Sequence, residues 1–196
     1  MYVEVPDEDA ADGDVAAWYA QQRASWGYLP NYAKAFALHP EVARAWNELN
    51  GAVRTQMDRR RYELATIAAA RTYRSTYCTA AHSKFLRDDC GDEEAMRAVA
   101  RDPSGASLDP VDRAVVAFAS RVAEDAAAIT ADDVAELRAL GLDDREVVDI
   151  VLAAAARAFF TKVLDALGVQ ADAQLGASFD PQTRAQVVVG RPFADG

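Results

Sequence analysis

The sequence has few of the features that mark several common classes of protein. Only two of the 196 residues are cysteines, too few for a disulfide framework. No basic cluster stands out, and a formal charge of −10 argues against a nucleic-acid surface. Asp149 and Arg157 divide the longest apolar run, VVDIVLAAAARAFF, so we expect no membrane span. These absences leave a globular protein that works on small molecules or on other proteins.

The first residues also lack the pattern of a secretory signal. The segment MYVEVPDEDAADGD is acidic where a signal peptide would be basic and then apolar. With two cysteines expected to be free thiols, this predicts a cytoplasmic protein with neither membrane nor nucleic-acid partners.

The residues that are present favour helices. About half are apolar, with alanine dominant among them, and only AQVVVGRPF resembles a strand. Helix boundary signals recur: we expect Asp14 and Asp109 to act as N-caps, and Thr130 and Asp133 to form a capping box. We predict an all-α fold of eight or nine helices. Its parts are an acidic arm at 1–13, a single helical domain at 14–178 and an extended tail at 179–196.

The stretch STYCTAAH places a cysteine and a histidine on one helix face. With Ser75 as N-cap, its hydroxyl can accept a backbone N–H, and Cys78 lies in the first turn. There the helix dipole lowers a thiol pKa. His82 follows one turn later on the same, mostly apolar face, so the pair by itself favours two buried core residues. Tyr77 lies beside the cysteine and can contact substrate or pack between subunits.

A buried histidine needs a hydrogen-bond partner, and Glu63 in YELATIAAA is the candidate. On one continuous helix Glu63 and Cys78 would be about 22 Å apart. They can meet only if the segment TYRST breaks the helix and folds the second half back. The alternative for Glu63 is a solvated carboxylate on the helix exterior.

The spacing Glu63-x11-Ser75-x2-Cys78-x3-His82 resembles the alkylhydroperoxidase D / carboxymuconolactone decarboxylase superfamily, whose redox members carry Glu-x11-Cys-x-x-Cys-x3-His. The segments LPNYAKAFALHPEVARAW and GLDDREVVDIVLAAAARAFFTKVLDALGV are similar to its peroxidase-related branch. The likeness covers roughly residues 25–170, with the motif core at about 58–125.

This resemblance implies a helical bundle, a homo-oligomer (trimer or hexamer) and peroxide reduction without a cofactor or a metal. It implies that Cys78 attacks the peroxide and that Glu63 and His82 move protons. Ser75 stands where the family has the cysteine that closes the disulfide. The resemblance therefore implies an external thiol reductant. Cys90 would lie about 18 Å from Cys78 along one helix, so we regard it as a bystander.

Three other functions stay open at this stage. Glu63 and His82 could perform cofactor-free acid–base chemistry on a small carboxylated substrate, as lactone decarboxylases of the superfamily do. Against this, the sequence shows no concentrated cluster of arginine and lysine near the motif to bind a carboxylate, apart from Arg71 and Arg74. A non-catalytic oligomeric protein is the second alternative. A metal site is the weakest, because Cys-x3-His lacks a further cysteine or histidine ligand.

Overall fold

The computed structural model describes residues 1–195, and all regular structure in that range is helical. This confirms the all-α class. Two short 3₁₀ turns, Glu8–Ala10 and Ala126–Ala128, accompany the α-helices. No helix among these residues is long and apolar enough to cross a lipid bilayer. The α-helices are α1 (Gly13–Trp26), α2 (Asn31–Ala35), α3 (Pro40–Gln56), α4 (Arg59–Thr72), α5 (Thr76–Asp88), α6 (Glu93–Arg101), α7 (Pro110–Asp125), α8 (Ala131–Ala139), α9 (Asp144–Ala166), α10 (Ala173–Ala177) and α11 (Pro181–Val187).

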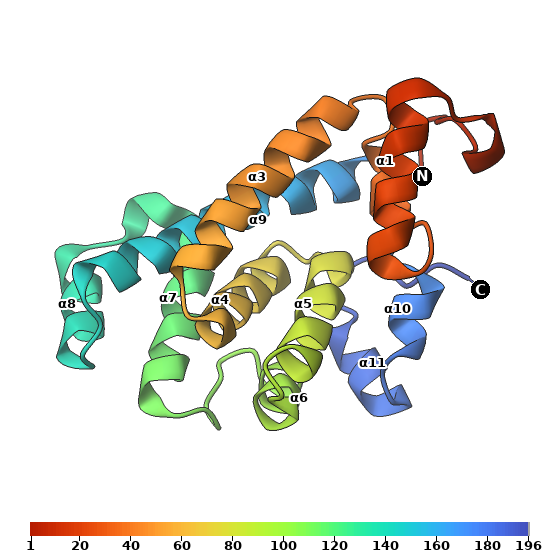
Figure 1. Cartoon of the computed structure of the whole chain (residues 1–196). Coiled ribbons are helices and arrows are strands. Elements are labelled where there is room, and N and C mark those ends of the chain that lie inside the picture. The colour runs from red at the N-terminus through yellow and green to blue at the C-terminus, as the bar shows by residue number, and fades with distance from the viewer. Residues whose placement is uncertain (196) are drawn as a thin grey trace.

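Helix α4 is the central element of the fold. It packs against α5, α7 and α9 (Figure 1), and every residue from Tyr62 to Ala70 is buried. A helix that is covered on all sides needs small apolar residues, and α4 supplies several alanines. Glu63 belongs to this buried segment, so its position on α4 takes it into the interior.

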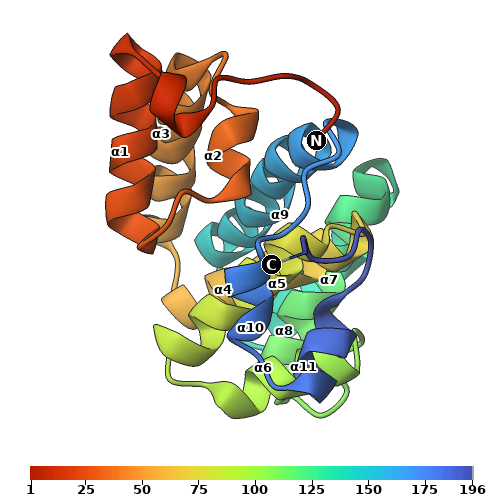
Figure 2. The ribbon, with the colours of Figure 1, turned by 90° about the vertical axis from the view of Figure 1, so that its right-hand side faces the viewer.

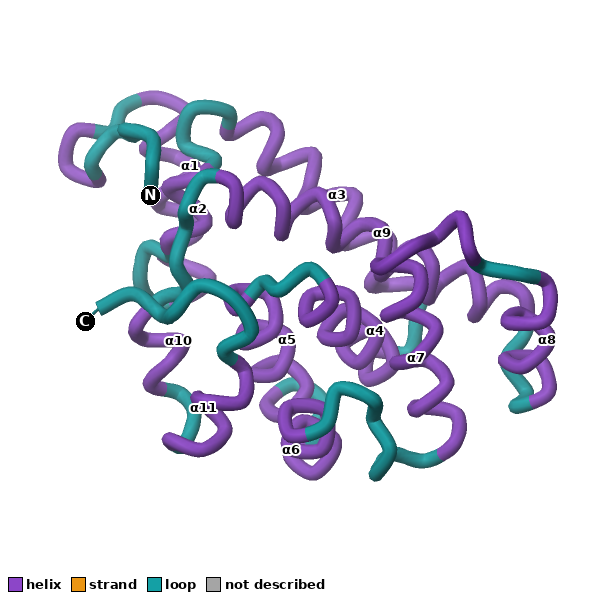
Figure 3. The backbone as a smooth tube through the Cα atoms, turned by 180° about the vertical axis from the view of Figure 1, so that it is seen from behind, coloured by secondary structure: helices purple, strands orange, loops and turns teal. Residues whose placement is uncertain are grey.

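The remaining helices form two groups around α4. Helices α1, α2 and α3 make one layer, in which α3 runs beside α9 (Figures 1 and 2). Helices α10 and α11 contact α5 and α6 at the opposite end, as the view from behind also shows (Figure 3). The site motif on α4 and α5 is therefore enclosed by α3 and α9.

A sharp turn between α4 and α5 produces the predicted break in TYRST. Arg74 adopts a left-handed backbone with φ of 58°, which is unusual for a residue with a side chain. The N–H of Ser75 donates to the carbonyl of Ala70, and the N–H of Arg74 donates to that of Arg71. This is a Schellman helix ending, and it reverses the chain so that α5 packs back onto α4.

Most predicted helix ends are confirmed, with one error. Asp109 caps α7, and Thr130 and Asp133 form the capping box of α8. The start of α1 is two residues earlier than predicted, with Asp12 and not Asp14 at the N-cap. Asp12 retains an extended backbone, whereas Asp14 is already helical.

The predicted extended tail is wrong for its first part. Residues 181–187 form α11, because the Asp180 carboxylate accepts the N–H groups of Gln182 and Thr183 and Pro181 occupies the first helical position. The later tail lies against the body, where Gly190 N–H donates to Thr76 Oγ1 at 3.0 Å. Gly196 lies outside the described residues.

Candidate functional site

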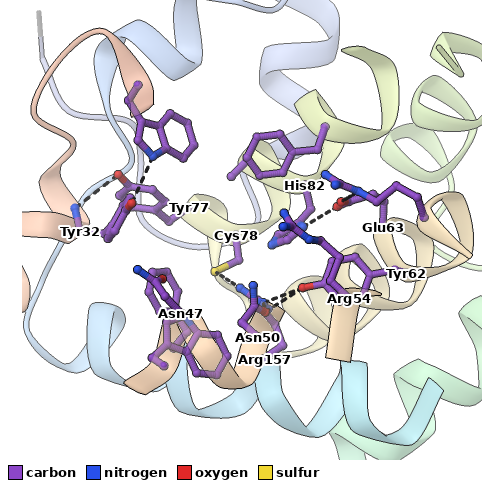
Figure 4. A pocket seen from close by; sticks show the side chains of 16 residues that line it. Tyr32, Asn47, Asn50, Arg54, Tyr62, Glu63, Tyr77, Cys78, His82 and Arg157 are labelled. Atoms are coloured by element: carbon purple, nitrogen blue, oxygen red, sulfur yellow. Dashed lines mark hydrogen bonds and ion pairs between the residues drawn. The ribbon is translucent and has the colours of Figure 1, made fainter. Parts of the chain in front are cut away.

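A pocket of about 120 Å³ lies between α3, α4, α5 and α9, and Glu63, Cys78 and His82 line it (Figure 4). Ser75, the fourth residue of the predicted motif, does not line it. Helical spacing places Cys78, His82 and Phe85 on the face of α5 that lines it. The exposed side chains of Asn47 and Arg54, both on α3, mark its opening to solvent.

Glu63 and His82 form a buried pair. The Glu63 side chain is completely inaccessible to solvent, and its Oε2 lies 2.5 Å from His82 Nδ1. Because the carboxylate accepts this hydrogen bond, Nδ1 carries the proton and Nε2 is left as an acceptor. Arg59 binds the other oxygen of Glu63 through Nε at 2.6 Å. The alternative of a solvated Glu63 is therefore wrong.

Cys78 is buried in the first turn of α5 and is not bonded to Cys90; both are free thiols. Its polar neighbour is Arg157 on α9, whose Nη1 lies 4.0 Å from Sγ. Among the described residues, no direct hydrogen bond joins Cys78 to His82 (Figure 4). The thiol and the imidazole therefore line the same pocket without touching through a hydrogen bond.

Ser75 occupies the N-cap position of α5 as predicted, but its hydroxyl makes no capping hydrogen bond. The Oγ atom is fully buried without a partner in the structure. It lies near the Cys78 thiol and the Asp165 carboxyl instead. Burial raises the pKa of both groups, and the Ser75 hydroxyl offsets part of that rise. The Ser75 hydroxyl therefore lies beside the thiol and the carboxyl and does not cap the helix.

Arg157 is a buried guanidinium that the structure surrounds with neutral groups. Its Nη2 donates to Asn50 Oδ1 at 2.7 Å and to the Tyr62 hydroxyl at 3.4 Å. Its Cζ lies 5.3 Å from the ring centre of Trp46 and 5.7 Å from that of Phe160. No carboxylate in the described chain pairs with it. Arg157 is therefore a cation available to negative charge at Cys78 or in the pocket.

The same region of the chain carries a family match. Residues 40–105, which span α3 to α6 and hold Glu63, Ser75, Cys78 and His82, match the Carboxymuconolactone decarboxylase family. The match covers this segment, about a third of the chain, and contains the whole motif. The predicted superfamily is thereby confirmed. No curated protein matches the sequence significantly.

Solved structures with the same fold cover nearly the whole chain. An alkylhydroperoxidase AhpD core, a peroxidase-related protein from Ralstonia eutropha JMP134, is 20% identical with a TM-score of 0.77, covering 97% of both chains. A peroxidase-related protein from Silicibacter sp. TM1040 is 21% identical with a TM-score of 0.78, covering 89% of this chain and 93% of that one. The debrominase Bmp8 is 15% identical with a TM-score of 0.68, covering 93% and 96%. At these identities the likeness establishes the fold.

Burial is the largest influence on the pKa values of Cys78 and His82. It raises the pKa of the Cys78 thiol, and Arg157 offsets part of the rise. Burial also lowers the pKa of His82, against the opposing effect of Glu63. The expectation that the helix dipole lowers the thiol pKa is therefore wrong in its net direction, because removing the thiolate from water outweighs it.

Tyr77 lines the pocket beside Cys78, and its hydroxyl donates to the buried Asp172 carboxylate. Burial, and next the charge of Asp172, raise the pKa of Tyr77. Asp172 also accepts the N–H of Asn31 at 2.8 Å, which joins α2 to the segment before α10. Tyr77 is thus a neutral, fixed part of the pocket wall; its contact with a substrate or another subunit stays a prediction.

The arginines of the pocket were not predicted from the sequence. Arg54, Arg59 and Arg157 line the pocket, whereas Arg71 and Arg74, which lie between Glu63 and Ser75 in the sequence, do not. Only Arg157 had a visible signal, because a charged residue interrupts an otherwise apolar helix sequence there. That signal was used solely to exclude a membrane span.

Proposed function

We propose that this protein is a one-cysteine peroxidase in which Cys78 reduces organic or hydrogen peroxides. The observation that carries the proposal is the meeting of three groups in one pocket: the Cys78 thiol, the Arg157 guanidinium and the Glu63–His82 pair. The family match and the peroxidase-related proteins of the same fold support a peroxidase-related role.

In the first step the Cys78 thiolate attacks one peroxide oxygen and the O–O bond breaks. The sulfur is oxidised to sulfenic acid, and the other oxygen leaves as an alkoxide or hydroxide that takes up a proton. Arg157 stabilises the thiolate. His82 Nε2 accepts the thiol proton through a water and returns it to the leaving oxygen, while Glu63 orients the imidazole and stabilises its transient charge.

The second step returns the sulfenic acid to the thiol. Ser75 has no sulfur, so an intramolecular Ser75–Cys78 disulfide cannot form. A first external thiol attacks the sulfenic sulfur and displaces water, giving a mixed disulfide. A second external thiol attacks that disulfide, which releases Cys78 and an external disulfide. Each turnover consumes two external thiols and one peroxide.

The test is site-resolved oxidation by cumene hydroperoxide. Reduced protein is mixed with the peroxide, sulfenic acid is trapped with dimedone, and labelling of Cys78 and Cys90 is followed by mass spectrometry. We expect Cys78 to react faster, and His82→Gln to slow it. Cys90 serves as the internal control. Equal rates at both cysteines would overturn the proposal.

A second candidate is cofactor-free acid–base chemistry by Glu63 and His82 on a small carboxylated substrate. The objection to it was the lack of nearby cations, and Arg54, Arg59 and Arg157 at the pocket remove that objection. Turnover of a carboxylated lactone by Cys78→Ser at the wild-type rate would favour this candidate over the peroxidase.

Homo-oligomer formation, as a trimer or hexamer, is part of the proposal. Exposed apolar side chains on the outer face of α9 support it: Val148 is 54% exposed, Leu152 45% and Phe159 43%. Such rows at helical spacing are typical of subunit interfaces. A non-catalytic oligomer is the remaining alternative. No turnover with any peroxide, together with equal thermal stability of wild type and Cys78→Ala, would favour it.

A further inference from the structure

Arg59 connects the buried Glu63–His82 pair to the surface of the protein. One Glu63 oxygen accepts the Nδ1–H of His82 at 2.5 Å (Figure 4), and the other accepts Arg59 Nε at 2.6 Å. Arg59 Nη2 donates in turn to Asp89 at 2.8 Å. Side-chain exposure rises along this chain, from 0% at Glu63 to 34% at Arg59 and 48% at Asp89. The buried carboxylate therefore meets its cation at the edge of the interior.

Three contacts hold the Arg59 guanidinium in place. Arg59 is the first residue of α4, and it reaches Glu63 one turn later on the same helix and Asp89 just beyond the end of α5. Its Cζ also lies 5.9 Å from the ring centre of Phe85. That ring packs edge-on against the His82 imidazole, with the two centres 5.6 Å apart. Arg59 thus contacts both the carboxylate and the aromatic ring that fix the histidine.

The charges around His82 oppose a proton on its ring. Burial is the main cause of its lowered pKa; Glu63 acts in the opposite direction, and Arg157 and Arg59 add to the lowering. The surrounding helices bring these groups that can carry charge to the pocket: Arg54 from α3, Arg59, Tyr62 and Glu63 from α4, Tyr77 and Cys78 from α5, and Arg157 from α9. Glu63 is the one carboxylate among them.

Arg59 decides the balance between the carboxylate and the imidazole. A buried carboxylate beside an imidazole favours the protonated ring, since the ion pair then has no net charge. A protonated ring carries a hydrogen on Nε2 and has no acceptor left. Because Arg59 binds the second oxygen of Glu63, it supplies the positive charge that the imidazolium would otherwise provide. A proton on His82 would then add an uncompensated buried charge.

We propose that Arg59 is a positioning residue that keeps His82 neutral, with Nε2 free to accept a proton in the pocket. It acts through Glu63 and does not itself take part in proton transfer. This inference rests on the proposed function, in which His82 Nε2 accepts the proton of Cys78. It goes further, because it assigns to Arg59 the control of the pH range in which the histidine can act.

The charge state of His82 can be measured directly by NMR on ¹⁵N-labelled protein, which reports the tautomer and charge of each imidazole. The chain has two histidines, and the exposed His39 serves as an internal reference. Arg59→Gln retains an N–H donor for Glu63 and removes the charge. We expect the midpoint of the His82 titration to rise by about one pH unit or more, the usual effect of one nearby charge. Arg59→Lys should recover part of this shift.

Arg61→Gln is the matched control. Arg61 lies on the same helix, is 31% exposed against 34% for Arg59, and pairs with Glu146 outside the pocket. It should leave the His82 titration unchanged. The proposal would be overturned if Arg59→Gln left the His82 midpoint at its wild-type value, or if Arg61→Gln shifted it equally.

A second comparison applies if Arg59→Gln fails to fold. Glu63→Gln is compared with the double variant Arg59→Gln/Glu63→Gln, in which no buried carboxylate loses its cation. The His82 midpoint should be higher in the double variant, because a positive charge near the imidazole has been removed. Equal midpoints in these two proteins would also overturn the proposal.

The peroxidase proposal fails separately. The rate of Cys78 oxidation by cumene hydroperoxide is followed against pH in wild type and Arg59→Gln. We expect the variant to be slower below its raised His82 midpoint and to approach the wild-type rate above it. A shifted His82 titration without any Cys78 oxidation would refute peroxide reduction and leave the role of Arg59 standing. Cys78 oxidation with an unshifted His82 titration would refute the role of Arg59 alone.

Discussion

Replacing Arg157 by methionine should raise the pKa of Cys78 and slow its reaction with peroxide. The guanidinium Nη1 lies 4.0 Å from Sγ in a buried setting. Two unit charges about 4 Å apart interact by about 4 kcal/mol at an effective dielectric constant of about 20, which corresponds to roughly 3 pKa units. The guanidinium charge is spread over three nitrogens, so we expect a rise of about one to three units.

The substitution should preserve the fold. Methionine retains an unbranched apolar stem for packing against Trp46 and Phe160. Asn50 Oδ1 still accepts the Tyr62 hydroxyl at 2.8 Å, so it is not left without a partner. Replacing a buried charge by an apolar group of similar size is often neutral for stability. A change in reactivity would then report on electrostatics and not on unfolding.

The assay is the pH dependence of Cys78 alkylation by iodoacetamide, resolved from Cys90 by mass spectrometry. Cys78 reactivity should rise with pH through the thiol pKa, at a higher pH in Arg157→Met than in wild type. Arg157→Lys should recover part of the difference. Arg145→Met, an exposed position on the same helix, should behave as wild type. The role of Arg157 would be refuted if the pKa of Cys78 were the same in Arg157→Met as in wild type.

Four further outcomes are expected. Burial lowers the pKa of His82 below its ordinary value of 6.5. Its stabilising contribution is therefore present above pH 6.5 and is lost as the pH falls through the folded-state pKa, so the Tm should decrease less steeply with falling pH in His82→Gln than in wild type. Ser75→Cys should form a disulfide with Cys78 on oxidation, detected by intact mass. Leu152→Glu should lower the molar mass measured by light scattering, and an unchanged mass would exclude this face as the interface. Gly190→Ala places a Cβ 1.9 Å from the Arg74 carbonyl oxygen. The free energy of unfolding, measured by thermal unfolding, should therefore decrease by about 1–3 kcal/mol.

Local sequence patterns were sufficient to predict many of the helix ends and the helix face that Cys78 and His82 share. Helix caps such as Asp109 and the Thr130–Asp133 box depend on neighbours three residues away, so the sequence displays them directly. The period of 3.6 residues places Cys78 and His82 on one face whatever surrounds them. The same local rule applies to α11, where Asp180 is the N-cap and Pro181 the first helical residue, so this helix too is encoded locally.

What the tertiary structure decided depends on segments far apart in the chain. Glu63 reaches His82 only because Arg74 takes a left-handed backbone and reverses the helix. Arg157 lies 79 residues from Cys78 in sequence yet is its polar neighbour. The sequence alone also did not determine whether the pKa of Cys78 is raised or lowered. The helix dipole acts locally, whereas burial is produced by every helix that covers the site. Spacing along one helix determines which side chains share a face, and only packing determines what that face meets and how far it is removed from water.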